Sequence, residues 1–268
     1  MNRLGFDDLG LAQDEQAVVG KAVSAGSGIV LFTGPVGSGK TNTLYAALDR
    51  VGERKVQIAG TERIQDLEIP GAVFHSAPEG GREAVFQSLA KEPAGVVVID
   101  ELKDTDDVRS AVRLVGAGHL VLSVVTGEDT AGVVARLVAM VDPKTGDPID
   151  AKALGDALLL VTSQRLFRKV CQKCGKPAQG TGEFAGGKLM RGIGCAECKG
   201  EGYRGRTPAY ELLPVTPAVR EAMVKRESVE EIRELAVKEG QRPLRQGAVE
   251  KVKNGETTVE QFREAGFR

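Results

Sequence analysis

An apolar run leads directly into a glycine-rich loop at residues 28–41, whose sequence is GIVLFTGPVGSGKT. The loop, Gly34–Thr41, fits the pattern G-x-x-x-x-G-K-[ST]. Glycines let a backbone turn around phosphate oxygens and aim several N–H groups inward, and a following helix adds its positive N-terminal end. Because the loop lies between an apolar run and a helical stretch, the pattern predicts a nucleotide-binding site.

Polar residues of this loop match the parts of ATP that a phosphate-binding loop contacts. Lys40 can bridge the β- and γ-phosphates, and the hydroxyl of Thr41 can bind Mg²⁺. We therefore expect ATP and Mg²⁺ as ligands, held by Gly34, Gly37, Ser38, Gly39, Lys40 and Thr41. The alternative is a glycine-rich strand–helix turn that binds nothing; the flanking pattern favours the nucleotide site.

Short apolar runs and helical patterns continue to alternate as far as about Leu160. The spacing predicts strands over 28–33, 55–59, 95–100 and 119–125, and helices over 41–51, 81–91 and 105–116. Strands that alternate with helices of 10–15 residues are typical of a parallel sheet covered by helices. The expected fold class is therefore α/β, with residues 1–165 as a nucleotide-binding core. The alternation of strands and helices alone assigns no function.

A second apolar run, Val96–Ile99, is followed by the carboxylates Asp100 and Glu101. The end of a parallel strand lies at the carboxyl edge of the sheet, beside the phosphate loop. We expect Asp100 to hold Mg²⁺ through water, and Glu101 to orient or deprotonate the attacking water. The 59 residues between Lys40 and Asp100 leave room for an extra strand, as in RecA-like ATPases. A strand followed by an acidic turn without a catalytic role is the alternative.

Four cysteines form two pairs, Cys171-x-x-Cys174 and Cys195-x-x-Cys198, with 20 residues between the pairs. Two such turns can present four thiolates at the corners of a tetrahedron, which is the preferred geometry of Zn²⁺. Four protein ligands leave no open coordination position, so the expected zinc site is structural. Binding of such a metal stabilises a small module that has few apolar residues of its own.

Five basic residues flank the first cysteine pair without any acidic residue: Arg165, Arg168, Lys169, Lys173 and Lys176. One interpretation is contact with nucleic acid or anionic lipid. The favoured interpretation is a solvated basic face that offsets the negative charge of a zinc–thiolate centre, because Phe167 is the one aromatic residue among them.

Composition excludes several classes of function. The chain of 268 residues has 36 Lys and Arg against 37 Asp and Glu, a net charge of −1 that does not suit a general polyanion binder. Only two histidines are present, so a centre with several histidine ligands is excluded. The first residues are too polar for a signal peptide, and no apolar run approaches the ~20 residues of a membrane helix. We expect a cytoplasmic protein with reduced thiols.

The composition shifts after Arg165. Residues 166–215 contain all four cysteines and many glycines, which indicates a small, loop-rich, zinc-binding insert. Residues 216–268 are predicted to be mainly helical. A capping box, Ser228-x-x-Glu231, precedes an apolar periodic stretch there, and Gly240 is expected to end that helix.

Several motifs follow one another in the order of a known family. They are Gly34–Thr41, Asp100–Asp104, Gly118–Ser123, Gln164–Leu166, Gly202–Thr207 and Tyr210–Leu213. Together they resemble the ATPases of bacterial type II secretion and type IV pilus assembly, over nearly the whole chain. The resemblance implies a RecA-like hexameric motor under the inner membrane that converts ATP hydrolysis into movement of a membrane platform protein. Members of that family often have a four-cysteine zinc module in this position.

The chain departs from the family pattern at several points. The acidic box of the family is replaced by a segment in which Glu62 matches in charge, so Glu62 joins Lys40 and Glu101 as an expected catalytic residue, but Arg63 stands in place of an aspartate. Thr126 stands where the family has a histidine, and Asp100 where it has a glycine. Family members have a preceding domain that helps complete the nucleotide site across the hexamer interface, whereas this chain starts almost at the core. We therefore expect weaker hydrolysis and a less stable hexamer.

The main hypothesis is an ATPase that couples ATP binding and hydrolysis to a membrane-associated secretion or pilus machine. Its expected partners are further copies of itself or a full-length motor ATPase, together with the inner-membrane platform protein, which would hold it peripherally at that membrane. The alternative is a degenerate regulatory subunit that binds nucleotide with little hydrolysis. A nucleic-acid-dependent ATPase with a zinc ribbon is disfavoured by the near-neutral charge and the scarcity of aromatics. His119 is expected to have a structural role.

Overall fold

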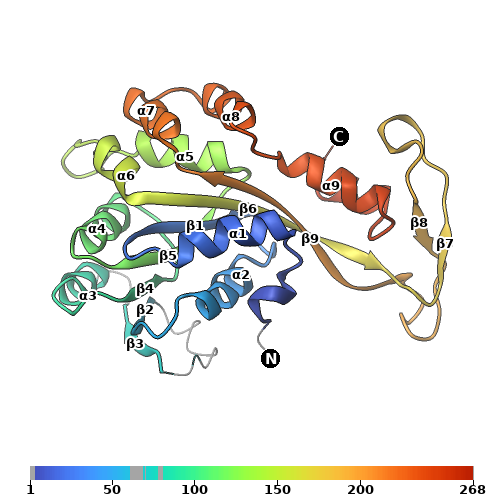
Figure 1. The fold of residues 1–268 in the computed structure, drawn as a ribbon, viewed down its shortest axis with the longest axis horizontal. Helices are drawn as coiled ribbons and strands as arrows, with labels where there is room; N and C mark the ends of the chain where they lie inside the picture. The colour runs from blue at the N-terminus through green and yellow to red at the C-terminus, as the bar shows by residue number, and fades with distance from the viewer. Residues whose placement is uncertain (1–3, 61–68, 70, 78–80, 268) are drawn as a thin grey trace.

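The computed structural model describes residues 4–60, 69, 71–77 and 81–267, and its main element is a seven-stranded sheet (Figure 1). Its strand order is β3-β2-β4-β5-β1-β6-β9. The strands of this sheet are β1 (Gly28–Gly34), β2 (Val56–Gly60), β3 (Val73–Ser76), β4 (Val96–Ile99), β5 (Leu120–Thr126), β6 (Leu158–Val170) and β9 (Tyr203–Pro214). Neighbouring strands are parallel except for β6 and β9, which are antiparallel.

Helices cover both faces of the sheet. They are α1 (Gln13–Val23), α2 (Lys40–Ala47), α3 (Arg82–Leu89), α4 (Thr105–Gly116), α5 (Thr130–Ala139), α6 (Ala151–Ala157), α7 (Pro217–Lys225), α8 (Val229–Lys238), α9 (Leu244–Lys253) and α10 (Val259–Glu264). Short 3₁₀ turns are η1 (Phe6–Leu9), η2 (Leu48–Arg50) and η4 (Gly182–Phe184). One apolar core packs α1 and α2 against one face, and a second packs α3 to α8 against the other.

The predicted alternation of strands and helices is confirmed, with bounds that shift by a few residues. All seven residues of β1 are buried, because a central parallel strand is covered on both faces. The edge strand β3 was not predicted from the sequence, and its half-exposed residues lack a continuous apolar run. No helix in the described part of the chain has both the length and the apolarity needed to cross a bilayer.

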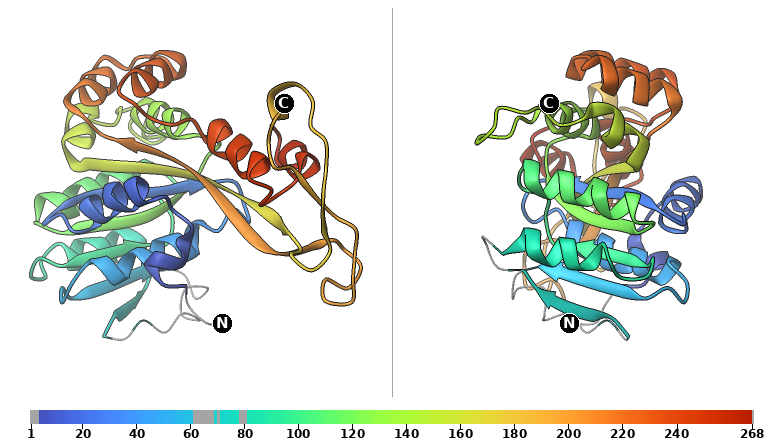
Figure 2. Two further views of the ribbon diagram at one scale, coloured as in Figure 1. Left: turned by 45° about the vertical axis from the view of Figure 1, so that its right-hand side comes forward. Right: turned by 90° about the vertical axis from the view of Figure 1, so that its left-hand side faces the viewer.

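The region after residue 158 differs from the expected loop-rich insert. The long strand β6 pairs with β1 only as far as Ser163, and beyond that point it continues as an antiparallel arm with β9 (Figure 2). The expected boundary after residue 165 thus falls inside β6, where the strand leaves the parallel sheet. Beyond the arm lies a small hairpin of β7 (Gly175–Pro177) and β8 (Met190–Gly192).

Residues 216–267 are mainly helical, with α7 and α8 against the core and α9 and α10 against the arm. The predicted capping box at α8 is present, with Ser228 accepting from the backbone of Glu231. Glu211 of β9 connects the two parts. One of its carboxylate oxygens accepts from the backbone N–H and the hydroxyl of Thr130, at 2.9 and 2.7 Å, and the other accepts from Leu244 N–H at 2.9 Å. Thr130 and Leu244 begin α5 and α9, so one carboxylate lies at two positive helix ends.

His119 lies at the amino end of β5, at the sheet edge opposite the glycine-rich loop. Its side chain is fully buried, and its Nδ1 accepts a hydrogen bond from the Gly95 backbone at 3.3 Å. An accepting Nδ1 requires the neutral ring. Burial lowers the pKa of His119, and this effect outweighs the opposite effects of a backbone contact with Leu89 and the charge of Glu92. This placement agrees with the structural role expected for His119.

The buried neutral ring predicts a pH-dependent stability. The pKa of a histidine in an unfolded chain is about 6.5, and the pKa of His119 in the folded protein is lower. The unfolding free energy therefore has its full value above that pH and decreases as the pH falls below it. The loss is at most about 1.4 kcal/mol for each pH unit. Urea unfolding should show that His119→Asn loses less unfolding free energy between pH 7.5 and pH 5.5 than the wild type does. The asparagine keeps a hydrogen-bond acceptor but does not titrate. Equal losses in the two proteins would contradict the assignment.

Candidate functional site

The glycine-rich loop connects the end of β1 to the start of α2, as predicted. Gly34, Gly37 and Gly39 have φ angles of +144°, +80° and +89°, which residues with a side chain rarely adopt. A Cβ atom on Gly34 would lie 2.5 Å from both the Ser38 hydroxyl oxygen and the backbone oxygen of Gln164. The loop is therefore a tightly wound backbone that only glycines permit at these positions.

Lys40 lies at the first turn of α2 and is mostly buried. Its Nζ donates hydrogen bonds to the backbone oxygens of Gly34 and Pro35, both at 2.8 Å. Burial lowers the pKa of Lys40; the carboxylate of Glu101 opposes this and the guanidinium of Arg165 adds to it. The ammonium therefore lies over the loop and within electrostatic reach of Glu101.

The loop also has polar groups that fit a phosphate-bearing ligand. Among the described residues, the buried hydroxyls of Thr33 and Ser38 have no hydrogen-bond partner. Gln164 of β6 donates a hydrogen bond from Nε2 to the Ser38 backbone oxygen at 2.7 Å, which ties the loop to the neighbouring strand. Thr41 is exposed at the start of α2. Ammonium, hydroxyls and positive-φ backbone together match the donor set that ATP with Mg²⁺ requires.

Glu101 follows β4 and lies at the same sheet edge as the loop, although β5 separates β4 from β1. Thr126, the last residue of β5, links the two motifs. Its hydroxyl donates to Glu101 Oε1 at 2.9 Å, and in the parallel register Thr126 is the direct neighbour of Gly34. The structure therefore brings Glu101 and the phosphate loop together, as the sequence predicted.

Asp100 has contacts that the sequence did not indicate. Its Oδ1 accepts from Arg82 Nη1 at 2.8 Å and from the Glu101 backbone N–H at 2.8 Å. Arg82 begins α3, and its 18-residue separation from Asp100 gave no sequence signal of this pairing. Glu62, the third expected catalytic residue, lies outside the described residues.

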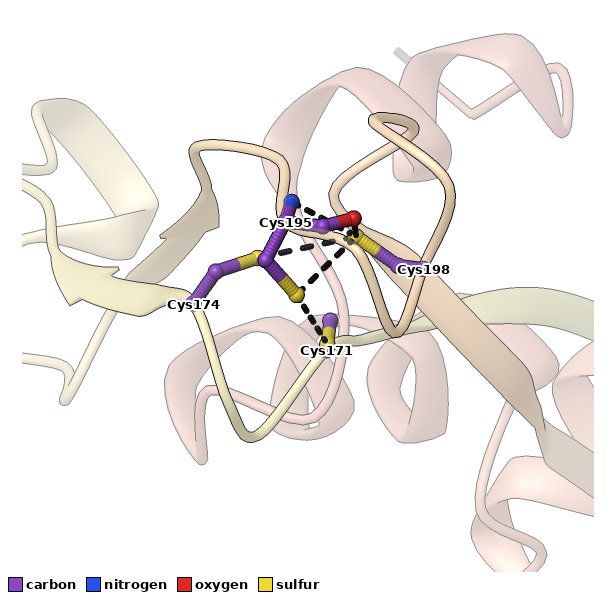
Figure 3. Close-up of side chains that lie close together, drawn as sticks. All are labelled: Cys171, Cys174, Cys195 and Cys198. Carbon is purple, nitrogen blue, oxygen red and sulfur yellow. Dashed lines mark hydrogen bonds between the residues drawn. The ribbon is translucent and has the colours of Figure 1, made fainter.

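The four cysteines gather beyond the end of the β6–β9 arm (Figure 3). Their sulfur atoms all lie within 4.8 Å of one another, and individual Sγ–Sγ distances are 3.9 Å (Cys171–Cys195), 3.8 Å (Cys174–Cys198) and 3.6 Å (Cys195–Cys198). A tetrahedron with Zn–S bonds of about 2.3 Å has edges of about 3.8 Å. The cluster thus has the dimensions of a zinc site.

Backbone donors favour the thiolate form of Cys198. The N–H groups of Cys195 and Gly202 donate to Cys198 Sγ, both at 3.2 Å. Although burial raises the pKa of Cys198, these backbone hydrogen bonds and the neighbouring thiols lower it to about 6, whereas burial raises the pKa of Cys174 to about 11. A thiol that ionises as readily as that of Cys198 is a suitable metal ligand.

Comparison with known sequences identifies a family. The model of the family described as "Type II/IV secretion system protein" matches residues 1–264. The type IV pilus assembly ATPase PilB of Thermus thermophilus is 32% identical over 270 residues, which cover 96% of this chain and 30% of that protein. Type II secretion system protein E of Dickeya dadantii is 33% identical over 270 residues, covering 97% of this chain and 52% of that protein. The chain spans about half the length of such relatives, or less.

Solved structures show the same fold. The pilus retraction motor PilT with bound ADP has a TM-score of 0.71 at 20% identity, covering 99% of this chain and 67% of that chain. The ATPase DotB of Legionella pneumophila has a TM-score of 0.69 at 16% identity, covering 98% and 65%. These likenesses support the RecA-like core, and the match to the family model over nearly the whole chain confirms the resemblance of its motifs. This chain therefore belongs to the type II/IV secretion system protein family, among whose curated members are the pilus-assembly ATPases.

Proposed function

We propose that this chain binds ATP with Mg²⁺ and hydrolyses it, and that the energy drives a secretion or pilus machine at the inner membrane. The observation that supports this most directly is the path from Gly34 of the phosphate loop to Thr126 and on to Glu101. This path, together with the electrostatic effect of Glu101 on Lys40, supports the proposal that Glu101 is the catalytic carboxylate. The relatives named above are secretion and pilus-assembly ATPases.

The expected chemistry follows from these groups. The loop N–H groups and Lys40 bind the β- and γ-phosphates, and Thr41 binds Mg²⁺, which neutralises charge that develops on the phosphate oxygens. A water molecule attacks the γ-phosphorus, its proton passes to Glu101, and the bond to the β,γ-bridging oxygen breaks, so that ADP leaves with the electron pair. The expected roles of Glu62 and of Asp100 as a water-mediated Mg²⁺ ligand stay predictions.

Zinc and the partners form the remaining parts of the proposal. We infer that Cys171, Cys174, Cys195 and Cys198 bind one structural Zn²⁺, which the sulfur distances and the backbone hydrogen bonds to Cys198 Sγ support. The proposed partners are further copies of this chain or a full-length motor ATPase, together with an inner-membrane platform protein. The chain would then work in the cytoplasm, held at the membrane through those partners.

Removal of the proposed base should separate hydrolysis from binding. Glu101→Gln should lower the rate of phosphate release by about 100-fold or more, because the amide cannot accept the water proton. Fluorescent ADP should bind with an unchanged Kd, whereas Lys40→Ala should weaken that binding. Turnover that survives in Glu101→Gln would contradict the role of Glu101. Nucleotide binding without any turnover in the wild type would favour the regulatory subunit instead.

Metal analysis tests the cysteine cluster. The purified protein should contain one zinc per chain, and Cys198→Ser should lose it and become sensitive to proteolysis between β6 and β9. Lys173→Gln, a change within the first cysteine turn that leaves all four thiols, serves as the matched control and should keep its zinc. A wild-type protein purified without chelator that contains no zinc, or a Cys198→Ser protein that keeps it fully, is the contrary result.

A further inference from the structure

Glu101 is held at three of its atoms, by its neighbour Asp100 and by two residues distant in the sequence, Arg82 and Thr126. Its backbone N–H donates to Asp100 Oδ1 at 2.8 Å, its backbone oxygen accepts from Arg82 Nη2 at 2.7 Å, and its carboxylate accepts from Thr126 at 2.9 Å. We call Arg82, Asp100 and Thr126 the Glu101 clamp. Contacts on both backbone polar groups and on the side chain restrict the φ, ψ and χ angles of one residue.

Arg82 is itself fixed in orientation. Its Nε donates to Asp107 Oδ1 at 2.9 Å, so the guanidinium has three different acceptors in Asp100, Glu101 and Asp107. The other oxygen of Asp107, Oδ2, accepts from the Lys103 backbone at 2.9 Å. The side chains of Arg82, Asp100 and Asp107 are only 11%, 13% and 4% exposed, so water competes little for these hydrogen bonds. A lysine has a point charge without the planar fork and cannot satisfy the same three acceptors.

Thr126 gives the clamp its connection to the phosphate loop. It is the exposed last residue of β5, between β4 and β1, and in the register Gly34 is its neighbour. The next residue, Gly127, cannot gain a side chain, because a Cβ there would lie 2.3 Å from Val133. The backbone at Thr126 is therefore confined by the strand pairing with β1 on one side and by the close approach of α5 at Gly127 on the other.

We propose that Arg82 and Thr126 are positioning residues that hold Glu101 in the geometry for hydrolysis, and that Asp100 acts with Arg82 on the backbone of Glu101. The proposal rests on the proposed ATPase function. Neither residue needs to contact nucleotide, so their loss should change the turnover rate and leave nucleotide affinity intact. Misplacement of a reacting group by about 1 Å can cost on the order of 100-fold in rate.

The experiment compares four single variants of the full chain by kcat for phosphate release and by Kd for fluorescent ADP. Thr126→Val removes the donor with little change of shape, and Thr126→Ser keeps it. Arg82→Lys keeps the charge but not the fork. Arg113→Gln is the matched control, because it breaks the neighbouring α3–α4 ion pair of Arg113 with Glu83 (2.6 Å) without a contact to Glu101.

We expect kcat to fall about 10-fold in Thr126→Val and about 10- to 100-fold in Arg82→Lys, with Kd within about twofold of wild type. Thr126→Ser should restore most of the rate, and Arg113→Gln should behave as wild type. A double-mutant cycle gives a further readout: Thr126→Val should not lower the residual rate of Glu101→Gln, because Thr126 acts only through that carboxylate.

Three results would overturn the clamp and leave the proposed function standing. Unchanged kcat in both Thr126→Val and Arg82→Lys would show that Glu101 needs no such support. Equal losses in Arg82→Lys and Arg113→Gln would assign the effect to helix packing. Additive losses in the double variant would show that Thr126 acts elsewhere. A wild-type protein without turnover would overturn the proposed function together with the clamp, whereas turnover that ignores these variants overturns the clamp alone.

Discussion

The parallel pairing of β1 with β5 determines where the parts of the candidate site lie. Both strands are buried along nearly their whole length, so a shift of register would turn apolar side chains out of both cores. The pairing ends at Gly34 opposite Thr126, the two residues at which the phosphate loop and the contact to Glu101 begin. The hydrophobic packing of the sheet thus fixes the distance between the loop and the carboxylate.

Charge is distributed over this edge in two separate groups. Lys40 donates hydrogen bonds to the loop carbonyls, and the charges of Glu101 and Arg165 affect its pKa. Arg82 belongs to the second group and forms ion pairs with Asp100, which follows β4, and with Asp107 of α4. Buried charges are stable only when they are paired and hydrogen-bonded. The two successive carboxylates after β4 therefore serve different neighbours, Glu101 towards β5 and Asp100 towards α3.

Strand β6 joins the candidate site to the cysteine cluster in one continuous element. Gln164 supports the phosphate loop, and Cys171 follows only seven residues later, just beyond the end of the strand. The antiparallel partner β9 contains Glu211, whose carboxylate lies at the amino ends of α5 and α9. The arm seen in Figure 2 is therefore tied to the nucleotide-binding core by a strand and by a buried carboxylate.

Short sequence patterns were enough to predict the parts of this protein whose structure depends on residues close together in the chain. The loop 34–41, the strand before Asp100, the α8 capping box and the cysteine spacing were all recognisable in the sequence, because backbone turns and periodicity are short-range properties. Arg82, the role of Thr126 and the support from Gln164 were not, since each contact joins residues 18 to 126 positions apart. Such pairs meet only when burial of the apolar strands fixes the register, and the continuous arm of β6 likewise depends on its distant partner β9.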